Sequence, residues 1–290
     1  MMQLIDSDIT SREVLNWTGL HIFHGWTSSC SQKLRIFLNL KGIDWQGHEL
    51  NLAAGESYSE WFLGLNPRGL VPVLVLDGAV HIESNDILAL LEDRYPEPCL
   101  FPANHSGDTD EIANLLRHED DLHLDLRTLS FRFVFGRTGS PKTADMMARY
   151  KDDGRTVNGD ANDPTRAHEL AFYERLADRG LTDDTVRASA GKLRTAFEEL
   201  EQRLATGPYY LGRDLSILDI AWFVYASRLN FGGYPFARLH PRVHAWRQAL
   251  AEDPRFAGEV ALPAPVRENL ERNHQAWTKA GTMFSDITGF

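Results

Sequence analysis

Four small side chains with nucleophilic or hydrogen-bonding groups stand together at residues 28–31, where the sequence reads Ser-Ser-Cys-Ser. They directly precede the apolar pattern from Leu34 to Leu40, whose spacing is typical of the buried face of a helix. Serine is a good N-cap, and the positive end of a helix dipole lowers the pKa of a nearby thiol. The cluster is therefore either a helix cap with one small buried cysteine, or a site at which Ser28 or Cys30 acts as a nucleophile or stabilises an anion.

A second candidate pair, Glu83 and Ser84, stands at the start of another predicted helix, which must end before Pro96. Ser84 is a natural N-cap, and that structural role alone explains it. The free N–H groups of a helix start also bind carboxylates, and Glu83 adds a negative group that can take an ammonium. The pair suits a ligand that carries both an α-amine and an α-carboxylate.

Pro72 directly precedes a predicted strand at residues 73–76. Because proline cannot donate to a sheet ladder, it belongs either at the first residue of the strand or in a cis turn. The first role is structural only. A cis-proline would turn the backbone groups of Val71 outward, toward an extended peptide ligand.

The elements around these residues alternate in type. Short strand patterns at residues 20–23 and 45–52 flank the helix that ends at Gly42, and a short helix is predicted at 57–65. Two apolar runs around Asp77-Gly78 predict a hairpin, and a helix follows it. After a proline-rich linker, long helical patterns dominate, at residues 112–135, 186–204, 217–229 and 243–250, with a polar loop predicted at 136–165. The order predicts an α/β domain followed by an all-helical domain.

Composition limits the classes of partner. The 290 residues carry a formal net charge of −11, which repels a polyanion, so we expect no nucleic acid. The two cysteines, Cys30 and Cys99, form no CxxC pair, which leaves a disulfide framework or zinc site without support. No apolar run is long enough to cross a membrane, and no signal peptide pattern is present. We expect no metal, no membrane and a cytoplasmic location.

The first long predicted helix carries a run of polar residues. Arg117 and Asp121 are four residues apart, as are Asp121 and Asp125, which places them on one helix face, with His123 nearby. This is either a solvated face with ion pairs or a polar wall of a second-substrate pocket formed by Arg117, Asp121 and His123. The spacing of the two histidines around residues 118–123 does not match a HExxH metal motif.

These motifs, taken in order, resemble the cytosolic glutathione S-transferase superfamily over about residues 20–256. The segments that carry the resemblance are Ser28–Ser31, Asn66–Leu74 with its Val-Pro pair, Glu83-Ser84, and the capping box Ser216-Ile217-Leu218-Asp219. Residues 28–31 and 41–44 resemble the zeta class, the maleylacetoacetate isomerases. With Lys33 and Arg35, the first segment also resembles glutathione-dependent reductive dehalogenases. The long polar stretch after Gly136 looks like those dehalogenases and the bacterial β-etherases.

The resemblance implies a thioredoxin-like, glutathione-binding domain at 20–102 and an all-helical substrate domain at 108–256, with extensions at 1–19 and 257–290. It implies that Val71 bonds the cysteinyl backbone of glutathione, that Pro72 is the family's cis-proline, and that Glu83 and Ser84 hold the γ-glutamyl end. Ser29 is expected to help bind glutathione, and Ser28 or Cys30 to activate its thiol.

The implied protein is a homodimer that attacks a small hydrophobic or aromatic electrophile, by conjugation, ether cleavage or dehalogenation. Two alternatives stay open. One is a zeta-like isomerase, and the other is a non-catalytic glutathione-binding or scaffold protein of the same fold.

Overall fold

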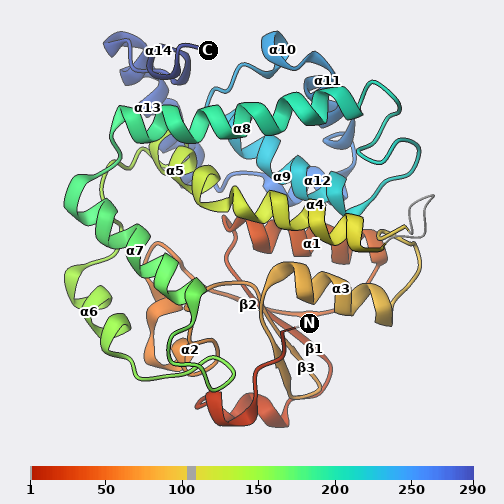
Figure 1. The fold of residues 1–290 in the computed structure, drawn as a ribbon, viewed down its shortest axis with the longest axis vertical. Coiled ribbons are helices and arrows are strands. Elements are labelled where there is room, and N and C mark those ends of the chain that lie inside the picture. Colours follow the sequence, from red (N-terminus) through yellow and green to blue (C-terminus); the bar gives the residue numbers. More distant parts are fainter. Residues whose placement is uncertain (1, 103–108) are drawn as a thin grey trace. The chain divides into compact units, whose positions relative to one another are not determined.

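The computed structural model describes residues 2–102 and 109–290, and the chain divides into two compact units. The first, which we call the sheet unit, comprises residues 1–96 together with 139–180. The second, the helical unit, comprises residues 97–138 and 181–290. Figure 1 shows all the labelled strands in the first of these and long helices in the second. The prediction of a thioredoxin-like domain and an all-helical domain is confirmed.

The sheet has four strands in the order β2-β1-β3-β4. Their bounds are β1 Leu20–His24, β2 Gln46–Glu49, β3 Val73–Leu76 and β4 Ala79–His81. β1 runs parallel to β2, with His21 opposite Gln46, and antiparallel to β3, with Ile22 opposite Leu74. β1 and β3 are buried along their whole length. β3 accordingly reads as a continuous apolar run, whereas β1 includes His21 and His24 among its apolar residues.

The β3–β4 hairpin turns at Asp77 and Gly78, both of which have positive φ, 49° and 83°. Two positive φ angles are what a two-residue type I′ turn requires. Gly78 is also approached closely by the N-terminal segment, because a Cβ there would stand 2.4 Å from the carbonyl oxygen of Leu15. The turn predicted from Asp77-Gly78 is therefore confirmed. Glycine is required at position 78 for a second reason as well, because the backbone of Leu15 leaves no room for a side chain there.

Two long helices of the sheet unit, α1 Ser29–Lys41 and α3 Ser84–Arg94, pack side by side (Figure 1). α1 begins after Ser28 and ends at Gly42, which adopts a left-handed φ of 64° and donates its N–H to Asn39. Between β2 and β3 lie only short helices, η3 Glu56–Tyr58 and α2 Glu60–Leu63.

Residues before β1 belong to the sheet unit. They contain two short 3-10 helices, η1 Asp6–Asp8 and η2 Arg12–Asn16. Leu4 donates to the carbonyl of Val80 at 2.9 Å, and Ile82 donates to that of Met2 at 3.1 Å, so this segment adds to the β4 edge. Leu4, Ile9 and Val14 are buried in the same apolar cluster as the sheet, so the segment predicted as an extension contributes to the core.

Residues 139–180 return to the sheet unit between two parts of the helical unit, and we call them the inserted segment. The polar stretch at 136–165 was predicted to be loop, but it contains α6 Ala144–Asp152, capped by Thr143. α7 Pro164–Arg179 follows, capped by Asp163. Asp8 anchors the segment by accepting hydrogen bonds from Thr156 and from the backbone N–H of Asn158. These partners lie some 150 residues away in sequence, so no local pattern could predict them.

The helical unit is built around α9 Ile217–Phe231, which is buried along nearly its whole length and packs against several neighbouring helices. The others are α4 Thr109–Asp121, α5 His123–Phe133, α8 Asp183–Arg203, α10 Phe236–Leu239, α11 Pro241–Leu250, α12 Pro254–Val260, α13 Ala264–Ala280 and α14 Phe284–Thr288. None of the helices formed by the described residues is long and apolar enough to cross a membrane.

The capping box predicted for α9 is confirmed. The Asp219 carboxylate accepts from the backbone N–H of Ser216 at 2.9 Å and of Tyr210 at 2.8 Å, and from Trp246 Nε1 at 3.1 Å. Burial raises the pKa of Asp219, and these hydrogen bonds oppose the rise. The role of Asp219 is therefore structural, as the sequence indicated.

Candidate active site at the starts of α1 and α3

The Ser28 cluster begins α1 in the way its sequence predicts. Ser28 occupies the N-cap, where its Oγ accepts a hydrogen bond from the backbone N–H of Ser31 at 3.3 Å. Ser29, the first helical residue, is buried, and Cys30, the second, is partly exposed. Because the cap uses Ser28 as an acceptor, its O–H hydrogen can still be donated to a ligand. The structural and the chemical interpretations of Ser28 are therefore compatible.

The loop before Ser28 is held by a buried arginine. Arg35 donates to the carbonyl oxygens of Gly25 at 3.3 Å and Trp26 at 3.1 Å, and its guanidinium lies 4.8 Å from the centre of the Trp26 ring. The Ser31 Oγ accepts from the N–H of Gly25 at 3.3 Å. Arg35 is 2% exposed, so it acts as an internal brace that fixes where α1 starts. Sequence reasoning quoted Arg35 only as part of a motif and missed this role.

The start of α3 differs in one respect from the prediction. Ser84 was predicted as the N-cap, but Glu83 occupies that position and Ser84 is the first helical residue. The reason is the backbone of Glu83, whose φ of 68° cannot belong to the helix. A non-glycine residue held with positive φ costs free energy, and such residues are concentrated at ligand sites. Directly before β3, the Val71–Pro72 bond is cis, the second of the two alternatives given by the sequence.

A buried lysine joins the two helices near their starts. Lys33 of α1 donates from Nζ to Oδ1 of Asn85, the second residue of α3, at 2.7 Å. Lys33 is 2% exposed, so this bond lies in the packed interface between the helices. It ties the second turn of α1 to the first turn of α3. Ser28 and the Glu83-Ser84 pair are thereby carried by two neighbouring helix N-termini, both of which attract anions.

Glu83 is part of a salt-bridge cluster that the sequence did not reveal. Arg68 donates from Nη1 to Glu83, and from Nε and Nη2 to the two oxygens of Asp163 in the inserted segment, with an Nε–Oδ1 distance of 2.9 Å. Burial acts to lower the pKa of Arg68, but the hydrogen bonds and charges of Asp163 and Glu83 outweigh it, so the pKa is raised. Arg68 therefore stays charged. The only sequence signal was Arg68 itself, within the segment Asn66–Leu74 that carries the resemblance.

The residues predicted to form a second-substrate wall do not lie on one continuous helix. The predicted helix at 112–135 is broken at Leu122, whose N–H bonds the carbonyl of Glu119, a tighter i to i−3 turn, and α5 starts anew after it. Arg117 and Asp121 are exposed on α4, and Arg117 donates to Asn114. His123 starts α5 and lies 3.4 Å from Arg127. The four-residue spacing across the break therefore does not define a common face, and a role for these three residues in a substrate pocket stays a prediction.

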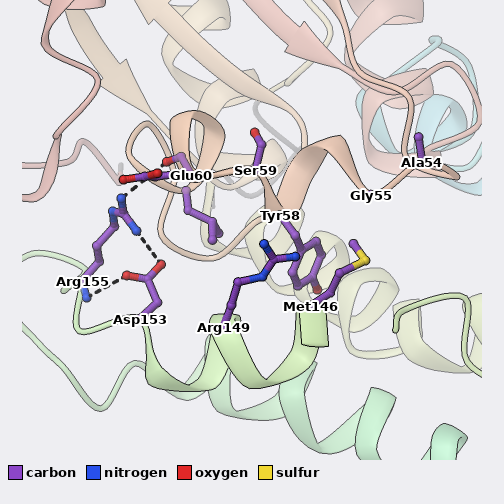
Figure 2. Close-up of a pocket in the computed structure, with 10 residues that line it drawn as sticks. Ala54, Gly55, Tyr58, Ser59, Glu60, Met146, Arg149, Asp153 and Arg155 are labelled. Atoms are coloured by element: carbon purple, nitrogen blue, oxygen red, sulfur yellow. Dashed lines mark hydrogen bonds and ion pairs between the residues drawn. The ribbon is translucent and has the colours of Figure 1, made fainter. Parts of the chain in front are cut away.

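An open pocket of about 430 Å³ lies elsewhere in the sheet unit, between the segment after β2 and α6 of the inserted segment (Figure 2). Arg155 spans it, donating to Asp153 at 2.8 Å and to the carbonyl of Glu60 at 3.4 Å. Tyr58 and Met146, both labelled in Figure 2, belong to its lining. Its lining includes none of the predicted site residues, and its Arg155 is paired with Asp153, so we assign it no ligand.

Comparison with known proteins agrees with this arrangement. The family model for the glutathione S-transferase N-terminal domain matches residues 27–94, and that for the C-terminal domain matches residues 183–249. The chain belongs to the cytosolic glutathione S-transferase superfamily. The inserted segment falls between the two matched regions.

Two relatives illustrate the similarity. A zeta-class glutathione S-transferase from Euphorbia esula is 42% identical over 96 residues, 33% of this chain and 43% of the relative. A maleylpyruvate isomerase from Ralstonia sp. is 39% identical over 88 residues, 30% of this chain and 42% of the relative. The match thus spans about two fifths of the length of these relatives.

Solved structures extend the similarity of fold to most of the chain. The beta-etherase from Sphingobium sp. strain SYK-6 has a TM-score of 0.68 at 23% identity, covering 83% of this chain and 98% of that chain. The holo structure of a maleylpyruvate isomerase, a bacterial glutathione S-transferase of the zeta class, has a TM-score of 0.53 at 22% identity, covering 84% of this chain and 99% of that chain, and likewise shows only the fold.

Proposed function

We propose that this protein is a glutathione-dependent transferase that activates the thiol of glutathione at Ser28. The observation that carries the proposal is the Lys33–Asn85 bond, which joins the second turn of α1 to the first turn of α3. Ser28 at one helix start and Glu83-Ser84 at the other then form two ends of a single site for an elongated anionic ligand.

The donor set fits glutathione. At its γ-glutamyl end glutathione has an α-carboxylate and an α-ammonium group. In the proposed complex the N–H groups at the start of α3 and the Ser84 hydroxyl bind the carboxylate, and Glu83 binds the ammonium. The backbone of Val71, beside Pro72, bonds the cysteinyl unit, and Ser29 contributes at the start of α1. Several of the relatives are glutathione S-transferases by name, which supports this ligand.

Ser28 carries the chemical step. Its O–H donates to the glutathione sulfur, and because a hydrogen bond to the charged form favours that form, it lowers the pKa of the thiol. The bound glutathione supplies the thiolate, which attacks an electrophilic carbon of a small hydrophobic or aromatic substrate while the leaving group departs. Conjugation, ether cleavage and dehalogenation all share this step. Similarity of fold to a beta-etherase favours substrates of this kind.

A second candidate is a zeta-like isomerase, which the zeta-class and maleylpyruvate isomerase relatives favour. In an isomerase Ser28 would activate the glutathione thiol in the same way, because isomerisation needs a thiolate that adds to an activated double bond and leaves again. The two functions differ in stoichiometry: a transferase consumes glutathione, whereas an isomerase needs only a catalytic amount. The third alternative, a non-catalytic binding protein, predicts no turnover of any electrophile.

The test is to titrate glutathione into the protein by calorimetry and then measure thiol consumption with a reactive aryl halide. Binding with thiol consumption supports the transferase, and binding without it counts against the transferase in favour of the isomerase or the scaffold. Absence of binding removes all three. We further propose that the chain is a homodimer, as in the resemblance that led to this function. A sedimentation mass of twice 32.8 kDa would support this, and a mass of 32.8 kDa would count against it.

A further inference from the structure

A turn of the inserted segment is fastened to the N-terminal segment before β1 by a small group of hydrogen bonds, which we call the clasp. The Asp8 carboxylate accepts from Thr156 Oγ1 at 2.6 Å, from the backbone N–H of Asn158, and from that of Gly159 at 3.4 Å. In return, the side-chain oxygen of Asn158 accepts from the backbone N–H of Ile5 at 3.3 Å. Asp8 is 3% exposed, so the clasp depends on a buried carboxylate whose partners here are neutral donors.

Asn158 and Gly159 are the two central residues of this turn. Their φ angles are 52° and 78°, and the flanking residues Val157 and Asp160 exchange backbone hydrogen bonds of 2.9 and 3.0 Å. This is a type I′ turn, for which Asn-Gly is a favoured sequence. Both central residues are exposed, whereas Val157 is 3% exposed and belongs to the apolar cluster of the sheet. Opening the clasp would therefore also loosen Val157 from the core.

Asn158 is the only asparagine of the chain that is directly followed by glycine. Such a pair is prone to deamidation, because glycine has no side chain to hinder attack by its own backbone nitrogen. The Gly159 nitrogen bonds to Cγ of Asn158 and loses its proton to water, while the Cγ–Nδ2 bond breaks and ammonia leaves. Water then opens the cyclic imide, giving aspartate by attack at Cγ or isoaspartate by attack at the backbone carbonyl carbon. A neutral amide is thus replaced by a carboxylate, with water as the only co-reactant.

We propose that Asn158 is a deamidation site and that its conversion opens the clasp. In the aspartate product, a second carboxylate stands on the residue whose backbone N–H binds Asp8, and like charges repel beside a buried group that water screens weakly. In the isoaspartate product, an extra methylene enters the backbone of the turn and breaks the pairing of Val157 with Asp160. Either product releases the inserted segment from the N-terminal segment. The inference is independent of the proposed function, because it involves no ligand.

The first measurement locates the deamidation. Wild-type protein is incubated at mildly alkaline pH and digested with trypsin, and the peptide of residues 156–166 is sequenced by mass spectrometry. The same peptide contains Asn162, which is followed by aspartate and serves as the internal control. We expect loss of the amide at Asn158 and not at Asn162, with isoaspartate among the products. An intact Asn158 in the protein, at a time when the free peptide of the same sequence has fully converted, would overturn the inference.

The second measurement asks whether a charge at position 158 opens the clasp. Asn158→Asp has the charge of the product, and Asn158→Gly is the matched neutral variant, because glycine adopts a positive φ readily. We expect Asn158→Asp to melt about 2–4 °C below Asn158→Gly and to be cleaved faster by protease within residues 139–180.

The same two variants are then compared in the Asp8→Asn background, where the repulsion is removed and the difference in melting temperature should largely vanish. This comparison separates repulsion from the conformational preferences of aspartate and glycine. Equal melting temperatures and cleavage rates of Asn158→Asp and Asn158→Gly would overturn the inference. A difference that persists in full with Asp8→Asn would overturn it as well.

Discussion

Tyr150 of the inserted segment donates its hydroxyl to the backbone carbonyl of Arg68 at 2.9 Å, inside the sheet unit. Tyr150 is 1% exposed, and burial raises the pKa of its hydroxyl, so it remains a neutral donor. Arg68 is thus held at its backbone by α6 and at its side chain by the cap of α7. The inserted segment therefore fixes the turn before Val71-Pro72 as well as the partner of Glu83.

We expect Tyr150→Phe to lower the free energy of unfolding by about 1–2 kcal/mol, because it leaves the buried carbonyl of Arg68 with one donor fewer. Tyr58→Phe is the comparison variant. Its hydroxyl lies 3.4 Å from Glu169, long for a hydrogen bond, so its loss should cost less. Denaturant titration measures the free energy of unfolding of each variant, and limited proteolysis reports on local opening of the inserted segment. An equal cost for both variants would show that the Arg68 contact is not specific.

Glu83→Gln and Ser84→Ala should each weaken glutathione binding, Glu83→Gln by about tenfold or more, because a charge-assisted bond to the ammonium is lost. Asp93→Asn, an exposed change near the other end of α3, is the control and should bind as wild type does. Calorimetric titration measures all three. Wild-type affinity in both site variants would contradict the assignment of the γ-glutamyl end to the start of α3.

Cys30→Ser separates two kinds of chemistry. If the reaction is conjugation or ether cleavage, activation of glutathione is sufficient, and the variant should keep most of its rate. In a reductive reaction, the Cys30 thiolate attacks the sulfur of the S-glutathionyl product, which releases the reduced product and leaves a Cys30–glutathione disulfide for a second glutathione to reduce.

We expect Cys30→Ser to keep most of the wild-type rate. Cys99→Ser, a change at the exposed second cysteine, is the control. Mass spectrometry of the products distinguishes the two. A stalled glutathione conjugate that accumulates only with Cys30→Ser would establish the reductive reaction in place of our expectation.

Burial lowers the pKa of His240, whose Nε2 lies 2.9 Å from the Tyr234 hydroxyl in the helical unit. The fold thus favours the neutral imidazole. Its contribution to stability is complete above the ordinary histidine pKa of about 6.5 and is lost as the pH falls through the lowered folded-state value. We expect His240→Gln to flatten the fall in melting temperature on acidification from pH about 7 to about 5. An unchanged slope in His240→Gln would refute the assignment.

Local signals made much of the fold predictable. Ser28 and Gly42 bound α1, Asp77-Gly78 makes the hairpin, and the Ser216 box starts α9, because each depends on residues only a few positions away. The break at Leu122 was missed because the apolar pattern continues across it.

The positions of the candidate site residues were predictable from the sequence only where those residues cap the helix that directly follows them. The position of Glu83 ahead of the helix depends on a positive φ that glutamate does not signal. The cluster of Arg68 with Asp163 joins residues 95 positions apart in sequence, and no periodicity reports such a pair. Lys33 and Arg35 were identified only as parts of a motif. Their burial follows from tertiary packing, which the spacing of residues in the sequence does not indicate.

The central claim is that Ser28 lowers the pKa of the glutathione thiol. The most direct test follows the ultraviolet absorbance of the glutathione thiolate bound to the protein as a function of pH. Wild type is compared with Ser28→Thr, which keeps the hydroxyl, and Ser28→Gly, which removes it but costs the helix cap only a few tenths of a kcal/mol.

We predict a bound thiol pKa clearly below that of free glutathione in wild type and Ser28→Thr, and a return toward the free value in Ser28→Gly, with turnover about 10²–10³ lower. A bound thiol pKa equal to the free value in wild type, or one that stays low in Ser28→Gly, would contradict the account.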